Sequence, residues 1–283
     1  MVNVTVDLGN YSIKYAGQNI GSFSSRISTQ FNPNPEAYDR IQIENETTYI
    51  GVGEYDRQFS KVEKNYLPSL LFAITEATNE SDINLCLLLP LVQMNNSSKF
   101  INKLKNTSFN FLVNGVPRTI NINKVVVLGE GFISQYMLEN NKDEILICDV
   151  GSRTINFLTI INGKTEYNYT ERLGVLDLYA NIKDIENSKG EDYIEEDIER
   201  LIKNGRIVVD SRVYLDFLKL ILNRIQAKVN IKNYKVYFTG GGSLLLKEYI
   251  EANTPAKVLE NAQFSNVLGA HKIAEIGWRG ANQ

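Results

Sequence analysis

The sequence predicts an α/β protein built from two similar halves. Residues 4–15 align with residues 146–157 when Asp7 is placed on Asp149, so nearly half the chain separates two copies of one segment. Strand-like runs alternate with helical patterns along the chain, which is typical of α/β layers. The 283 residues, 43% of them hydrophobic, are enough to bury the cores of two ordinary domains.

The repeated segment has the same pattern in both copies. Each reads apolar, Asp, apolar, Gly, two variable positions, hydroxyl, Ile, variable, aromatic. Strand-forming residues on both sides of a glycine-containing turn indicate a hairpin with the Asp at the tip of its first strand. Residues 125–131 and 236–242 form a second candidate pair, because each runs from an apolar strand through glycines into a helical pattern. The two pairs together favour duplication of a whole domain.

The remaining elements are predicted in chain order. Residues 28–60, with Pro33, Pro35 and a polar stretch, break the rhythm and predict an irregular insertion or small subdomain at the edge of the first half. The predicted domains are 1–140, completed by 267–283, and 141–266. The patterns predict a strand at 83–89, a helix near 93–105, strands near 107–122 and helices at 131–140, near 174–184, 191–204 and 211–229, and at 264–274.

Composition excludes several classes of protein. A net charge of −3 and a pI near 5.5 give no field that attracts polyanions, so little direct DNA binding is expected. No run approaches the roughly 20 apolar residues of a membrane span, and the N-terminus enters a strand without a basic signal-peptide head. Cys86 and Cys148 lie in apolar strand runs as buried thiols, which fits a reducing cytoplasm.

The two Asp-x-Gly hairpins fit the chemistry of a polyphosphate with Mg²⁺. Glycine lets backbone N–H groups approach phosphates closely, and carboxylates hold the water shell of the metal. Asp7 and Asp149 are therefore candidate magnesium residues acting through water, and Lys14 is placed to neutralise phosphate charge. One such tripeptide is also an ordinary turn, but a matched pair favours function. The candidate phosphate-binding turns are Gly9, Asn10, Tyr11 and Ser12, and Gly151, Ser152, Arg153 and Thr154.

Three further features have a functional and a structural interpretation. Gly240, Gly241 and Gly242 would let a flat nucleoside lie against backbone, or simply form a tight strand-to-helix turn. Glu130 follows a buried strand and is a candidate to orient the water that attacks the γ-phosphate, or a first-turn helix acid. His271 is the single histidine, so a Ser-His-Asp triad would have to use it, and a structural or surface role is preferred.

These segments resemble the five nucleotide-site motifs of the actin superfamily. The resemblance implies duplicated actin/ribonuclease-H-like domains with a cleft between them for ATP or GTP with Mg²⁺. It assigns Asp7 and Asp149 to the metal, Glu130 to the attacking water, Lys14 to a phosphate and the three glycines to the nucleoside. In order, the matching segments are 4–15 (phosphate-1), 125–138 (connect-1), 145–160 (phosphate-2), 236–249 (adenosine) and 267–274 (connect-2).

Within that superfamily the chain resembles the plasmid-segregation actins ParM and AlfA, through residues 87–91, Glu130 and residues 173–175. The resemblance implies a filament-forming ATPase or GTPase that segregates plasmid DNA through a DNA-binding adaptor protein. Ser152 and Arg153 stand where the family often has smaller residues, and the short stretch 174–236 favours the AlfA-like type. Two alternatives remain: a small-molecule kinase of the same fold, although no second candidate Asp base accompanies Asp7, and an actin-like scaffold without turnover.

Overall fold

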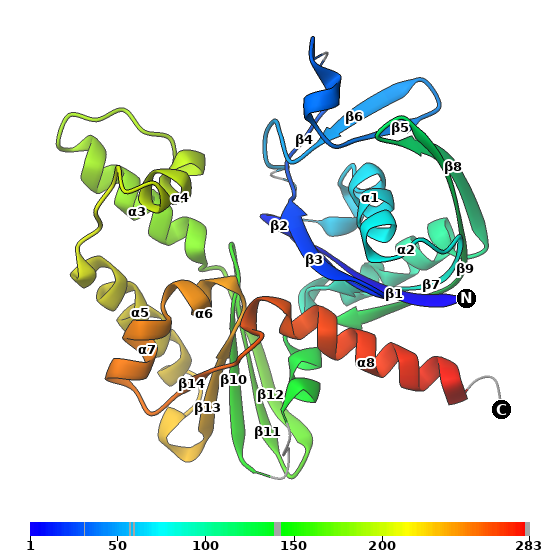
Figure 1. Cartoon of the computed structure of the whole chain (residues 1–283). Coiled ribbons are helices and arrows are strands. Elements are labelled where there is room, and N and C mark those ends of the chain that lie inside the picture. The colour runs from blue at the N-terminus through cyan, green and yellow to red at the C-terminus, as the bar shows by residue number, and fades with distance from the viewer. Residues whose placement is uncertain (31, 57, 59, 139–142, 281–283) are drawn as a thin grey trace. The chain divides into compact units, whose positions relative to one another are not determined.

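The computed structural model describes residues 1–30, 32–56, 58, 60–138 and 143–280, and the chain divides into two compact units (Figure 1). Unit 1 contains Met1–Met137 and Asn266–Gln283, and unit 2 contains Leu138–Ser265. The predicted boundary between residues 140 and 141 lies outside the described residues. No helix in the described ranges is long and apolar enough to cross a bilayer.

Unit 1 is organised by a nine-stranded sheet with the order β3-β2-β1-β7-β9-β8-β5-β6-β4. The adjacent strands β1, β7 and β9 run parallel, and the pairs on either side of them are antiparallel. Residues 83–89 of β7 are all buried, as expected for a parallel strand covered on both faces. The strands are β1 (Val2–Leu8), β2 (Ser12–Ala16), β3 (Ile20–Ser24), β4 (Ile27–Ser28), β5 (Arg40–Ile43), β6 (Glu46–Ile50), β7 (Asp82–Leu89), β8 (Thr107–Val113) and β9 (Val116–Gly129).

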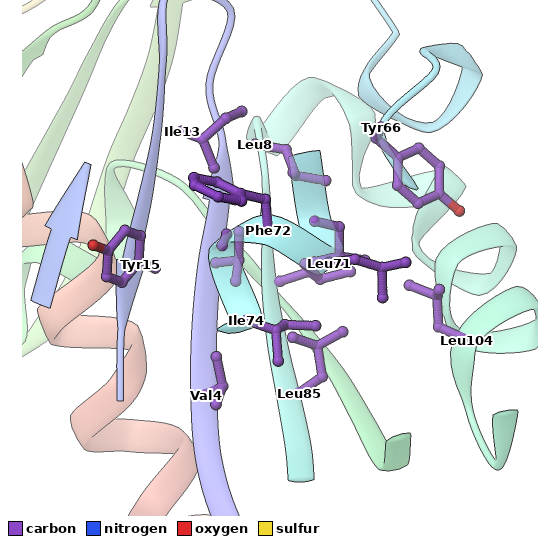
Figure 2. Packing of buried hydrophobic residues seen from close by; sticks show 14 of the residues in the cluster. Val4, Leu8, Ile13, Tyr15, Tyr66, Leu71, Phe72, Ile74, Leu85 and Leu104 are labelled. Atoms are coloured by element: carbon purple, nitrogen blue, oxygen red, sulfur yellow. The ribbon is translucent and has the colours of Figure 1, made fainter. Parts of the chain in front are cut away.

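A helix absent from our sequence predictions, α1 (Leu67–Ala77), forms the centre of the unit 1 core. It contacts β1, β2, β3 and also β5, so the sheet curves around it. Figure 2 shows Leu71, Phe72 and Ile74 of α1 packed with side chains of β1, β2, β7 and α2 (Ser97–Leu104). Because α1 is enclosed, it is apolar around nearly its whole circumference and lacks the 3.6-residue alternation that marks a surface helix.

Two sequence predictions in unit 1 are corrected. Segment 28–60 is not irregular throughout, because β5 and β6 form a hairpin and β5 pairs with β8, which extends the sheet. Its strands are short and contain several polar residues, as is typical of sheet edges, so the alternation of apolar and polar residues that predicts a strand is weak here. The helix predicted at 131–140 is a short 3₁₀ helix, η4 (Phe132–Met137), and residues 139–140 lie outside the described part of the chain. The side chains of Ser134 and Gln135 bond backbone carbonyls there, which competes with helical bonding.

The sheet of unit 2 repeats the topology of five adjacent strands of the unit 1 sheet. Its sheet has the order β12-β11-β10-β13-β14, with the same parallel and antiparallel neighbours as β3-β2-β1-β7-β9. The predicted α/β fold with two similar halves is confirmed. The predicted second pair is wrong, because β13 holds the position of β7 rather than that of β9. The strands are β10 (Ile145–Val150), β11 (Ile155–Ile161), β12 (Lys164–Glu171), β13 (Lys235–Thr239) and β14 (Lys257–Val258).

Helices cover the unit 2 sheet and complete its core around Phe157 of β11 and Phe238 of β13, both at most 1% exposed. The stretch 174–236, short as it is, holds three of these helices, so the second half keeps a helical layer before β13. The helices are α3 (Val175–Asn187), α4 (Glu195–Lys203), α5 (Ser211–Gln226), α6 (Gly241–Leu245) and α7 (Lys247–Asn253).

The C-terminal helix α8 (Ser265–Gly280) carries the single histidine and gives a first prediction. His271 lies against β1, with Nδ1 3.2 Å from the Thr5 hydroxyl. Burial lowers the pKa of His271, and the Glu275 carboxylate opposes this only partly. Because the unfolded chain then binds the proton more readily, stability falls as the pH drops below about 6.5.

An NMR titration of the His271 ring, unambiguous in a chain with one histidine, is expected to give a midpoint below 6.5. His271→Gln should flatten the dependence of the unfolding free energy on pH between about 5 and 7. A midpoint at or above 6.5 would contradict the buried position of this ring.

Candidate functional site

The unit 1 site begins at Asp7, near the carboxyl end of β1. Asp7 is 4% exposed and lies opposite Lys14 in the register of β1 and β2. The Lys14 Nζ atom is 3.7 Å from Asp7 Oδ2. The two residues predicted to serve the metal and a phosphate are therefore neighbours across one hairpin.

A second lysine, Lys61, joins Asp7 to Glu130. Its Nζ atom lies 2.7 Å from Asp7 Oδ1 and also donates to Glu130 Oε1. Lys61 is 3% exposed, and its backbone N–H donates to Gln93 Oε1 at 3.0 Å. Sequence reasoning missed Lys61 because it follows a segment predicted to be irregular, in the 3₁₀ turn η2 (Lys61–Glu63), where no periodicity marks it.

The topology of the sheet explains why these groups meet. The strands β1, β7 and β9 are parallel, so their carboxyl ends share one edge. Asp7 lies at the end of β1, Glu130 follows β9, and Gln93 lies in η3 (Leu91–Asn96) after β7. The backbone N–H of Glu130 donates to the Leu89 carbonyl at 2.8 Å, which fixes the start of this turn. Ligand sites in α/β sheets are found at this edge.

Two opposing effects set the charge state of the buried pair. Burial raises the pKa of Asp7, but the ammonium groups of Lys61 and Lys14 more than compensate and hold it below its ordinary value. Burial lowers the pKa of Lys61, and the carboxylates of Asp7 and Glu130 reverse that effect and raise it. Both residues are therefore charged at neutral pH.

The phosphate-1 turn after β1 is held by its surroundings. A Cβ atom on Gly9 would lie 2.3 Å from the Ser12 carbonyl oxygen, so the turn requires glycine there. The Asn10 carbonyl accepts from the Ser25 hydroxyl at 2.7 Å, and its side-chain oxygen accepts from Lys64. The Tyr11 ring stacks on the Tyr55 ring with centroids 4.9 Å apart. The shape of the turn is thus fixed by contacts that sequence spacing does not reveal.

The unit 2 site is built around Asp149, in the second-last position of β10. Asp149 is 5% exposed and in register with Asn156 of β11 and Thr239 of β13. A Cβ atom on Gly240 would lie 2.4 Å from Asp149 Oδ1, so the backbone of Gly240 passes directly beside the carboxylate. The structure therefore brings together two groups that were predicted separately, the Asp of phosphate-2 and the first of the three glycines.

The turn from Gly151 to Thr154 is closed by a bond from the Gly151 N–H to the Thr154 carbonyl, 2.9 Å. The first N–H groups of α3 donate to it, from Val175 to the Gly151 carbonyl at 3.1 Å and from Leu176 to the Ser152 carbonyl at 2.9 Å.

Gly174 makes this contact possible, because a Cβ atom there would lie 2.3 Å from the Ser152 carbonyl oxygen. Its own N–H donates to Asp177 Oδ2 at 2.7 Å. Sequence reasoning noted Gly174 only for its likeness to a family, and missed that it supports this turn.

The donor set fits a hydrated metal better than a directly bound one. Among the described residues, no three His, Cys, Asp or Glu side chains lie together as a metal site. Magnesium usually keeps several waters and is held by one or two carboxylates together with substrate phosphates. Asp7 with Lys14 and Lys61 in unit 1, and separately Asp149 beside glycine backbone in unit 2, each offer a carboxylate of the kind that can hold the water shell of such a metal.

Comparison with protein families gives a match in the first half of the chain. Residues 5–132 match the family model described as "Actin like proteins N terminal domain". A search of curated protein sequences finds no match.

Solved structures with the same fold cover almost the whole chain. The structure of Ta0583, an archaeal actin homologue, in complex with ADP has a TM-score of 0.80 and 19% identity, covering 98% of this chain and 100% of its own. A 15-stranded ParM filament from Clostridium botulinum has a TM-score of 0.79 and 18% identity, covering 97% and 99%. An AlfA filament from a B. subtilis plasmid has a TM-score of 0.66 and 18% identity, covering 95% and 97%. The predicted resemblance to actin-like proteins, including ParM and AlfA, is confirmed at the level of the fold.

Proposed function

We propose that this chain, which has the fold of actin-like proteins, is a cytoplasmic nucleotide-dependent ATPase or GTPase that assembles into filaments. In this proposal both hairpin turns serve a Mg-nucleotide. Asp7 and Asp149 hold the water shell of Mg²⁺, Lys14 neutralises phosphate charge, and Glu130 orients the attacking water. The turns 9–12 and 151–154 bind phosphates, and Gly240, Gly241 and Gly242 contact the nucleoside.

One observation carries the proposal. Asp7 and Asp149 lie near the ends of equivalent strands, β1 and β10, in two sheets with the same order and the same strand directions. Each is followed by a turn in which a Cβ atom on the glycine would lie less than 3 Å from a backbone oxygen, so neither turn tolerates a larger residue without moving. A turn repeated for structure alone would not need a buried carboxylate in both copies.

The cellular role is proposed from the neighbours in fold. One ParM structure and one AlfA structure of this fold are filaments, so we propose that head-to-tail contacts between copies of this chain continue as a helical polymer, loosened by hydrolysis. AlfA comes from a plasmid, and we propose that this chain likewise segregates plasmid DNA. Its net charge of −3 favours a separate DNA-binding adaptor protein over direct contact with DNA.

Nucleotide-dependent sedimentation together with phosphate release, in Mg-ATP and in Mg-GTP, tests this proposal. The wild-type chain should pellet and release phosphate with at least one nucleotide and without any acceptor molecule. Phosphate transfer only when a sugar or acid acceptor is added would favour the small-molecule kinase. Nucleotide binding without release would favour the scaffold, and no binding at all would contradict the proposal.

The second prediction concerns Asp149→Ala. Loss of a carboxylate that orients the metal shell should weaken Mg-nucleotide binding about 10- to 100-fold and abolish nucleotide-dependent pelleting. Titration of a fluorescent nucleotide in the presence of Mg²⁺ and of EDTA measures the effect. Asp216→Ala is the matched control, because Asp216 is an exposed carboxylate on α5 paired only with nearby Lys219 in the contacts described. Equal nucleotide affinities for the two variants would show that Asp149 does not contribute to nucleotide binding.

A further inference from the structure

Lys61 forms ion pairs with both Asp7 and Glu130 in the interior of unit 1. The roles proposed for these two carboxylates do not explain why a buried lysine joins them. The Lys61 ammonium contacts the carboxylate assigned to the metal and the carboxylate assigned to the attacking water, Asp7 and Glu130. Its side chain is 4% exposed, against 18% for the Lys14 side chain. A lysine of this kind is held in place by charge and not by packing alone, since an unpaired buried ammonium would be strongly disfavoured.

Among the ion pairs described, the charges of the cluster balance. Asp7 and Glu130 contribute two negative charges, and Lys61 and Lys14 two positive ones. Asp7 Oδ1 cannot accept from the water shell of a metal in the direction already taken by the Lys61 ammonium at 2.7 Å. Binding of a Mg-nucleotide through Asp7 also brings a divalent cation next to the Lys61 ammonium, and the repulsion between these like charges favours movement of Lys61 towards another anion.

The backbone restricts where Lys61 can go. Its N–H donates to the buried side chain of Gln93 at 3.0 Å, so the peptide is anchored at the sheet edge and only the side chain is free to turn. The bond to Glu130 keeps the ammonium beside the group proposed to hold the attacking water. In the function proposed above, Glu130 holds the water that attacks the terminal phosphate, so the anion that a nucleoside triphosphate would bring beside Glu130 is that phosphate.

We propose that Lys61 is a phosphate-sensing residue, an inference that rests on the function proposed above. In the empty site it joins Asp7 to Glu130, and in the loaded site it keeps Glu130 and exchanges Asp7 for an oxygen of the terminal phosphate. Lys61 then distinguishes a nucleoside triphosphate from a diphosphate, because only the triphosphate supplies the replacement partner. Lys14, which contacts Asp7 alone among the pairs described, should bind phosphate without this discrimination.

The test compares Lys61→Met with Lys14→Met in the full chain. Methionine keeps an unbranched side chain of similar length and removes the ammonium. Dissociation constants are measured by calorimetry with the Mg-complexes of a non-hydrolysable ATP or GTP analogue and of the matching diphosphate. Lys61→Met should weaken the triphosphate analogue on the order of 10- to 100-fold, the range of a buried charge-assisted hydrogen bond, and the diphosphate by less than about threefold. Lys14→Met should weaken both alike.

The triphosphate preference separates this role from a merely structural one, and a second readout tests the bridge in the nucleotide-free chain. Without nucleotide, Lys61→Met leaves Asp7 and Glu130 facing each other without their shared cation, so the melting temperature should fall, and Lys61→Met/Glu130→Gln should recover part of the loss. If the single variant does not fold, the binding comparison is made in the Glu130→Gln background. An unchanged preference for triphosphate in a folded Lys61 variant would overturn the inference and leave the proposed function standing. A wild-type chain that binds neither nucleotide would overturn both.

Discussion

Replacement of Glu130 by glutamine is expected to slow phosphate release about 10²- to 10⁴-fold, the contribution typical of a side chain that accepts a proton from the attacking water. The amide oxygen of glutamine still accepts a hydrogen bond from Lys61, so the bridge to Asp7 is retained in a neutral form. Nucleotide binding should therefore change little, and filaments formed with nucleotide should persist longer because hydrolysis no longer loosens them.

Single-turnover phosphate release and the decay of light scattering after nucleotide is diluted measure the two effects together. Glu63→Gln is a suitable control, since Glu63 also pairs with a lysine, Lys99, but both side chains are about half exposed. Wild-type release rates in Glu130→Gln would show that another group holds the water. Release and binding lost in parallel would show that Glu130 acts on the site as a whole and not on the chemical step.

The parts of the site that the sequence predicts are those specified by local chain geometry. An Asp followed by a glycine turn between two strands depends on about ten consecutive residues, so both copies are visible in the sequence and align with each other. Glu130 and the glycines from 240 to 242 are candidates for the same reason, because each directly follows an apolar run at the end of a strand. The structure places Asp149 and Gly240 against each other because β10 and β13 are neighbours in the sheet, a pairing that the sequence analysis did not predict.

The parts that the sequence does not predict depend on contacts between distant segments. Lys61 reaches Asp7 and Glu130 from 54 and 69 residues away, and nothing in its neighbourhood distinguishes it from an exposed lysine. Helix α1 was not predicted because an enclosed helix has no polar face and therefore lacks the periodic pattern that marks a surface helix. The assignment of residues 125–131 as the partner of 236–242 failed because β7 and β9 both end in an apolar run followed by a turn, and only strand order separates them.

The glycine run at 240–242 allows the sharpest test of unit 2, because adjacent glycines have opposite requirements. Gly240 has φ 85° and ψ 163°, a region that is essentially closed to other residues. A Cβ atom there would also lie 2.4 Å from Asp149 Oδ1 and 2.5 Å from the Val150 carbonyl oxygen. For Gly241, the first residue of α6, an added Cβ atom meets nothing within 4 Å.

Gly240→Ala should therefore destabilise the chain by about 2 to 5 kcal/mol, from backbone strain and from displacement of the Asp149 carboxylate, which corresponds to a fall in melting temperature of roughly 10 °C. Gly241→Ala should leave stability within about 0.5 kcal/mol. Thermal unfolding of both variants, with and without Mg-nucleotide, separates the two effects. Since the nucleoside is proposed to lie on this turn, Gly241→Ala should lose part of the stabilisation by nucleotide while keeping the stability of the nucleotide-free chain. If nucleotide stabilises Gly241→Ala and the wild type equally, the nucleoside does not lie on this turn. If Gly240→Ala is as stable as the wild type, the backbone conformation described for Gly240 is contradicted.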